Sequence, residues 1–124
     1  MLALEPLRGL RVVATPDALD RARWTGSPIL LRFAPDEMLA IDAVTVDIDD
    51  EDAIVEHETG FVGARLAPDD LARLIAHVDW PLPTDAGALA QGKVAGVPAK
   101  LRLGPAPLLV TNAAYADELV DRLG

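Results

Sequence analysis

Short apolar runs, separated by glycine, proline and aspartate, recur along most of the chain. They lie at residues 10–14 (LRVVA), 29–33 (ILLRF), 54–58 (IVEHE), 61–66 (FVGARL) and 108–111 (LLVT). Runs of this length that are rich in Val, Ile and Leu and bounded by turn residues are typical of β-strands. Several links between them are short enough for hairpins, which favours a mostly antiparallel sheet.

Two longer segments also predict strands. Residues 38–48 (MLAIDAVTVDI) alternate apolar and polar side chains in their second half, as a half-buried strand does. Residues 94–103 predict a strand broken at Gly96 and Pro98, and we therefore expect it at a sheet edge or with a bulge.

Three segments predict helices. Thr15 and Pro16 provide an N-cap and a first helical residue for a short helix over residues 16–24. The second helix opens at residues 67–70 (APDD) and carries an apolar stripe that is formed by Leu71, Leu74, Ile75 and Val78. Asn112 caps a final helix over residues 113–123.

The order of these elements predicts an α+β fold. We expect a mostly antiparallel sheet with two or three helices on one face, in a ferredoxin-like arrangement. Residues 1–26 follow a looser pattern and predict an N-terminal arm or an appended strand–helix. Residues 27–124 then form a single α+β domain.

The composition narrows the classes of partner. The 124 residues include 20 acidic and 11 basic side chains and no cysteine, and the formal net charge is −9. Nucleic acids and anionic membranes require clustered Lys and Arg, so we expect neither as a partner. A protein partner or a homo-oligomer is favoured instead. Without a predicted signal peptide or a membrane-spanning segment, the expected location is the cytoplasm.

The strongest candidate for chemistry is the acidic stretch at residues 47–58 (DIDDEDAIVEHE). Asp47, Asp49, Glu51 and Glu58 stand at positions 1, 3, 5 and 12 of a calcium-loop spacing. Position 6 of such a loop requires glycine, but Asp52 stands there. The flanking segments also predict strands rather than helices. We therefore favour a solvated turn, and a Ca²⁺-binding domain remains the alternative.

Charge is unevenly distributed along the chain. Ten of the twenty acidic residues lie between Phe33 and Ala64, where there is no Lys or Arg. This segment predicts a negative sheet edge, which resists aggregation between strands. A docking surface for a basic partner is the functional interpretation.

Catalytic patterns are absent from the sequence. His57 and His77 are the only histidines, and no nucleophile, phosphate-loop or zinc motif accompanies them. We predict no catalytic residue and no cofactor, so the sequence favours a non-enzymatic role.

Four segments resemble the sarcosine oxidase gamma-subunit family. They are residues 31–39 (LRFAPDEML), 61–82, 91–103 and 114–119 (AYADEL), in the family's order, with Met38 and Ala67 in place of the usual Trp and Gly. The resemblance implies a folate-binding-domain-like fold and an accessory subunit. Such subunits assemble with catalytic subunits that hold the flavin and the folate. The alternative from a different class is a small folate- or one-carbon-binding enzyme.

Overall fold

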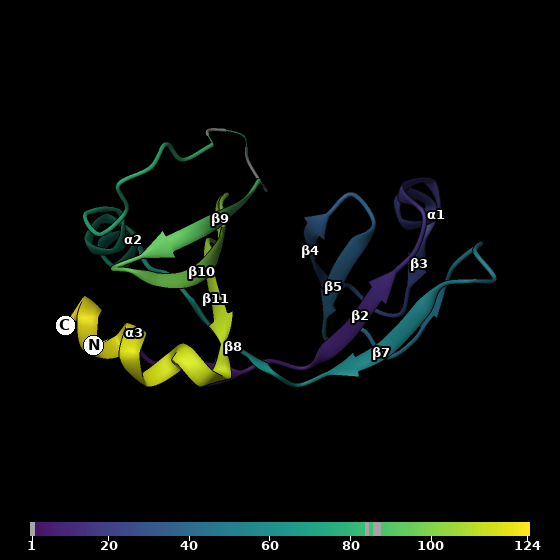
Figure 1. Cartoon of the computed structure of the whole chain (residues 1–124), viewed down its shortest axis with the longest axis horizontal. Coiled ribbons are helices and arrows are strands. Elements are labelled where there is room, and N and C mark those ends of the chain that lie inside the picture. Colours follow the sequence, from purple (N-terminus) through teal and green to yellow (C-terminus); the bar gives the residue numbers. More distant parts are fainter. Residues whose placement is uncertain (1, 84, 86–87) are drawn as a thin grey trace. The chain divides into compact units, whose positions relative to one another are not determined.

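The chain folds into two compact units. The computed structural model describes residues 2–83, 85 and 88–124 (Figure 1). Leu7–Thr59 form one unit, and Gly60–Gly124 together with the residues up to Pro6 form the other. Every strand pairing recorded among the described residues is antiparallel. The predicted class, α+β with mostly antiparallel sheets, is confirmed.

The C-terminal unit is built on a five-stranded sheet. Its strands, in spatial order, are β1 (Glu5–Pro6), β8 (Phe61–Arg65), β11 (Leu108–Asn112), β10 (Val97–Arg102) and β9 (Leu89–Val94). Two α-helices, α2 (Pro68–Ile75) and α3 (Ala116–Leu123), pack Leu74 and Leu119 on the sheet face that carries Leu101 and Leu109. A 3₁₀ turn, η1 (Ala113–Tyr115), precedes α3. Both helices therefore cover one face of this sheet.

Local signals explain where these helices begin. The backbone N–H of Ala67 donates to Asp70 Oδ2 at 3.2 Å, which satisfies one donor at the start of α2. The Asn112 side chain accepts a hydrogen bond from the backbone N–H of Ala114 at 2.9 Å. It thus caps η1, and the helical segment begins where the sequence predicts it.

The other unit contains a four-stranded sheet and a two-stranded sheet. The larger sheet has the order β4 (Ile29–Ala34), β5 (Glu37–Ile41), β2 (Gly9–Val13) and β7 (Ile54–Glu58). The smaller sheet pairs β3 (Arg23–Trp24) with β6 (Val46–Asp47). Helix α1 (Pro16–Arg21) packs Ala18 and Leu19 into a core with Leu10, Val12 and Met38. None of the helices in the described part of the chain is long and apolar enough to cross a membrane.

The structure divides the chain at other positions than the expected 1–26 and 27–124. Strand β2 lies between β5 and β7 and is hydrogen-bonded to both. Residues of β2 and α1 therefore share a core with later strands, while β1 pairs with β8 of the C-terminal unit. The α-helices are consequently distributed over two units instead of lying on one sheet.

Two strand predictions differ in detail from the structure. Asp42 adopts a φ of 70° after β5, so residues 38–48 form two strands, and Val44 is 68% exposed between them. Ala95 and Gly96 have φ values of 50° and 80° and form a two-residue turn, so β9 and β10 make a hairpin. This hairpin replaces the single broken strand that was expected over residues 94–103.

Candidate functional site

The acidic stretch occupies the end of β6, a turn and the whole of β7. Ala53 donates its backbone N–H to Asp50 O at 3.2 Å, which closes the turn between the two strands. Asp49, Glu51 and Asp52 are exposed there. The favoured interpretation, a charged turn between strands, agrees with this geometry. The two flanking strands, however, belong to different sheets.

Two of the four residues at the calcium-loop positions pair with arginines on different strands, and the other two lie in the turn. Asp47 Oδ2 lies 3.7 Å from Arg23 Nε, and Glu58 Oε1 lies 3.6 Å from Arg11 Nη1. Asp49 and Glu51 are exposed in the turn. Over residues 2–83, 85 and 88–124, no three carboxylate or imidazole groups gather in a way that could hold a metal ion. The structure therefore does not bring these carboxylates together as a ligand set.

Asp50 has a structural role within the acidic stretch. Its Oδ1 accepts the backbone N–H of Asp52 at 2.9 Å, and its Oδ2 accepts the backbone N–H of Thr15 at 3.0 Å. Thr15 is the N-cap of α1, and its own hydroxyl accepts from Ala18 N. One carboxylate thus holds the acidic turn against the start of α1.

Replacing Asp50 with alanine is expected to lower the free energy of unfolding by about 1–2 kcal/mol. The substitution leaves two backbone N–H groups without their carboxylate acceptor. Asp49→Ala, a neighbouring exposed carboxylate, is the matched control and should change stability by less than about 0.5 kcal/mol. Urea unfolding of both variants measures the difference, and equal effects would contradict this role.

Arg11 connects three strands of the four-stranded sheet. It lies on β2, donates a hydrogen bond from Nε to Glu37 Oε2 on β5, and also pairs with Glu58 on β7. The hydrogen bond with Glu37 and the charges of both glutamates raise the pKa of Arg11 above its ordinary value, and partial burial opposes this. Because the pKa of Arg11 is higher in the folded chain than in the unfolded chain, its interactions with the two glutamates stabilise the fold at neutral pH. This contribution is lost under strongly alkaline conditions, as the pH rises through the folded-state pKa.

Strand β7 forms an edge of this sheet and exposes apolar side chains. Among the described strands it pairs only with β2, so its other side has no strand partner. Ile54 is 55% exposed and Val55 is 44% exposed, although consecutive strand residues point to opposite faces. Glu56 and His57 follow them and are also exposed. This end of the sheet thus combines an unpaired edge, two exposed apolar side chains and negative charge.

A second candidate site is a groove on the five-stranded sheet. It has a volume of about 500 Å³ and lies on the face opposite α2 and α3. Lys93, Lys100, Gln91, Phe61 and Tyr115 are among its lining residues. The Lys100 ammonium donates to Gln91 Oε1 at 2.9 Å. A volume of this size is within the range of small-molecule sites in proteins.

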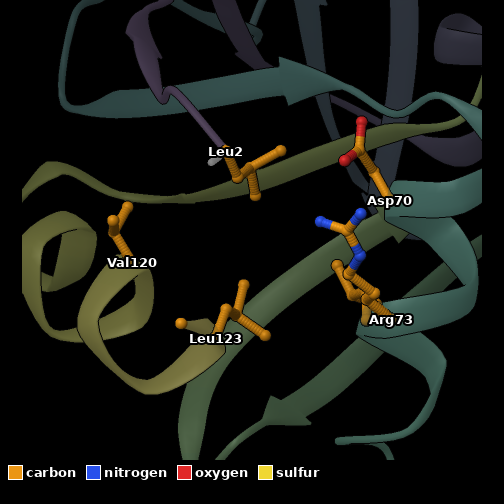
Figure 2. A pocket seen from close by; sticks show the side chains of 7 residues that line it. Leu2, Asp70, Arg73, Val120 and Leu123 are labelled. Carbon is orange, nitrogen blue, oxygen red and sulfur yellow. The ribbon is translucent and has the colours of Figure 1, made fainter.

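A smaller cavity lies between α2, α3 and the N-terminal segment (Figure 2). It encloses about 50 Å³ and is walled by Leu2, Val120 and Leu123, with Asp70 and Arg73 on the α2 side. Ligand sites in proteins typically measure about 300–1,000 Å³. This cavity is therefore a packing gap between helices rather than a ligand site.

The basic groove was not anticipated from the sequence. The C-terminal sheet carries Arg65, Lys93, Lys100 and Arg102 on one face, because the strand register places them on the same side. The signal lies in residues 91–102, where Lys93, Lys100 and Arg102 stand among small and apolar side chains. These residues can be assigned to one face of the sheet only when the register of the β9–β10 hairpin is known. His77, the other histidine, is exposed and lies in neither site.

Comparisons with protein-family models, with curated proteins and with solved structures give no match to this chain. The resemblance to the sarcosine oxidase gamma-subunit family stays a prediction from the four sequence segments.

Proposed function

We propose that this chain is a non-catalytic accessory domain that binds a protein partner through the edge of β7. The single observation that carries the proposal is the exposure of Ile54 and Val55 on a strand that pairs on one side only among the described strands. Folded proteins usually protect such edges, because an exposed edge strand can form backbone hydrogen bonds with a strand of another chain. An edge that combines open backbone groups with exposed β-branched side chains is suited to strand addition.

Charge defines the kind of partner. Glu51, Asp52 and Glu56 are exposed around these apolar side chains, and no Lys or Arg occurs from Phe33 to Ala64. Like charges that face each other across an interface are unfavourable. A second copy offering the same edge would place acid against acid, so the proposed partner is a different protein with a basic, extended segment. This agrees with the accessory role that the sarcosine oxidase gamma-subunit resemblance implies.

Affinity capture with paired variants tests this proposal. Wild-type chain and Ile54→Lys/Val55→Lys are immobilised at equal density and exposed to extract from the source cells. Because both side chains are exposed, the variant should fold normally, and it should retain at least about tenfold less of the partner.

The matched control is Val44→Lys, which adds a positive charge at a 68% exposed valine of the same unit, outside β7. It should retain as much partner as wild type. Equal capture of the partner by all three proteins would contradict the proposal.

A further inference from the structure

Strand β9 is the outer strand of the five-stranded sheet and, among the described strands, pairs only with β10. Lys93 pairs in register with Pro98, which has no backbone N–H. This pair comes one residue after the pair of Val94 and Val97, which flanks the turn. Hydrogen-bonded and non-hydrogen-bonded pairs alternate along an antiparallel ladder. The backbone N–H and C=O of Lys93 therefore point away from β10, toward the outer side of β9.

The segment that follows α2 lies along this outer side. We call residues 76–83 the strap. The backbone N–H of Ala95 donates to His77 O at 3.1 Å, and Trp80 Nε1 donates to Lys93 O at 2.8 Å. The end of β9 next to the turn is thus covered by a loop, which is one of the ways in which proteins block edge strands.

Trp80 fits against β9 because Gly92 has no side chain. Ala90 and Val94 belong to the core of this unit, so Gly92 between them faces the same side of the sheet. A Cβ on Gly92 would lie 2.6 Å from Trp80 Cε2 and 2.7 Å from Trp80 Cζ2. The indole therefore occupies the space of the absent side chain, and this position brings Nε1 to the outward carbonyl of Lys93.

The β7 edge of a second copy of this chain is complementary to β9 in charge. Strand β9 (LAQGKV) contains one lysine and no acidic residue, whereas β7 (IVEHE) contains two glutamates and no Lys or Arg. Opposite charges on adjacent antiparallel strands are stabilising. Strand β7 also exposes Ile54 and Val55 and pairs on one side only among the described strands. An uncovered β9 would therefore have a matching edge on every other copy.

A contact between β9 of one copy and β7 of another would be open-ended. The two edges are different surfaces, so each such contact leaves an unused β7 edge on one copy and an unused β9 edge on the other. Heterologous contacts of this kind add further copies, as rings or as open filaments, instead of forming a two-fold dimer. Closing one of the two edges is sufficient to prevent this assembly.

We propose that Trp80 closes the β9 edge and thereby prevents the β7 edge of a second copy from adding to it. The indole takes the Lys93 carbonyl that an incoming strand would use. Pro81 and Pro83 have no backbone N–H, so the strap cannot extend the sheet at these positions. This role of Trp80 requires the exposed edge of β7 but not the proposed protein partner. With β9 closed, β7 is available to a different protein.

The test is sedimentation velocity of the purified full chain over a series of concentrations. Trp80→Ala should self-associate with an association constant at least about tenfold larger than that of wild type. Gly92→Ala keeps the tryptophan, but its Cβ displaces the indole from β9, so this variant should associate in the same way. It decides the outcome if Trp80→Ala does not fold.

Second substitutions assign the association to the two edges. Adding Ile54→Lys/Val55→Lys to Trp80→Ala should abolish association by blocking β7. Adding Lys93→Pro should abolish it by blocking β9, because proline removes the backbone N–H that points to the outer side. Leu82→Ala is the matched control, because it truncates another strap residue that packs on the same core and leaves the contact between Trp80 and Lys93 in place. It should associate no more than wild type.

Three results would overturn the proposal. They are a folded Trp80→Ala variant that associates no more than wild type, association of Leu82→Ala equal to that of Trp80→Ala, and association of Trp80→Ala that persists after the β7 substitutions. The second result would mean that lost core packing causes the association. The third would mean that β7 is not the edge that Trp80 keeps away from β9.

Discussion

Gly9→Ala is expected to lower the free energy of unfolding by about 3 kcal/mol, at the upper end of the usual cost of overpacking. Gly9 lies in β2, opposite Ile41 of β5. An added Cβ would lie 2.2 Å from Ala40 O and 2.9 Å from Ala40 C, and both are backbone atoms of the neighbouring strand. Because a side-chain rotation cannot relieve this contact, β2 and β5 must separate locally.

The measurement is urea unfolding followed by the fluorescence of Trp24, in a Trp80→Phe background. Trp24 packs against the core of the same unit as β2, and the chain has only these two tryptophans. Gly26→Ala is the control: its added Cβ meets no atom within 4 Å, and its φ of 68° should cost only about 1 kcal/mol. A Gly9→Ala variant no less stable than this control would refute the close approach of β2 and β5.

Leu109→Ala is expected to destabilise the C-terminal unit by about 2–5 kcal/mol, the range for truncation of a fully buried leucine. Leu109 has no exposed surface, lies on β11 in the middle of the five-stranded sheet, and belongs to one cluster with Leu74 and Leu119. Truncation leaves a cavity where both helices meet the sheet.

Trp80 packs against the same cluster, so its fluorescence in a Trp24→Phe background reports this unit. Ile75→Ala, at a 42% exposed position at the end of α2, is the matched control and should cost less than about 1 kcal/mol. A Leu109→Ala variant as stable as the control would mean that the helices do not pack on β11.

The strands and helices whose positions are marked by nearby residues were predictable from the sequence. Strands such as β4 and β11 follow apolar runs between turn residues, and α2 follows from Pro68, two aspartates and the spacing of Leu71 and Leu74. In each case the deciding interactions lie within a few residues of one another. For these elements, the local sequence preference agrees with the structure that the whole chain adopts.

The division into units was not predictable, because it depends on pairings between distant residues. Pro6 pairs with Val62, whereas Gly9, three residues later, pairs with Ile41 and Glu58. Neither the composition nor the periodicity of these residues marks a boundary between them.

The two candidate sites also depend on strand pairings that the sequence does not reveal. The acidic stretch was evident from composition, but its edge position depends on β7 pairing only with β2 among the described strands. The basic groove depends on the β9–β10 turn, which Ala95 and Gly96 form in place of the Asn-Gly or Asp-Gly pair that marks such turns in a sequence. Without that turn, Lys93 and Lys100 cannot be placed on one face.

The central claim, that the edge of β7 is where this domain binds its partner, is tested most directly by amide hydrogen exchange of the chain alone and with the captured partner. Strand addition forms new backbone hydrogen bonds along that edge. We therefore expect exchange to slow most within Ile54–Glu58. Slowing confined to other elements, with unchanged exchange in β7, would contradict the account.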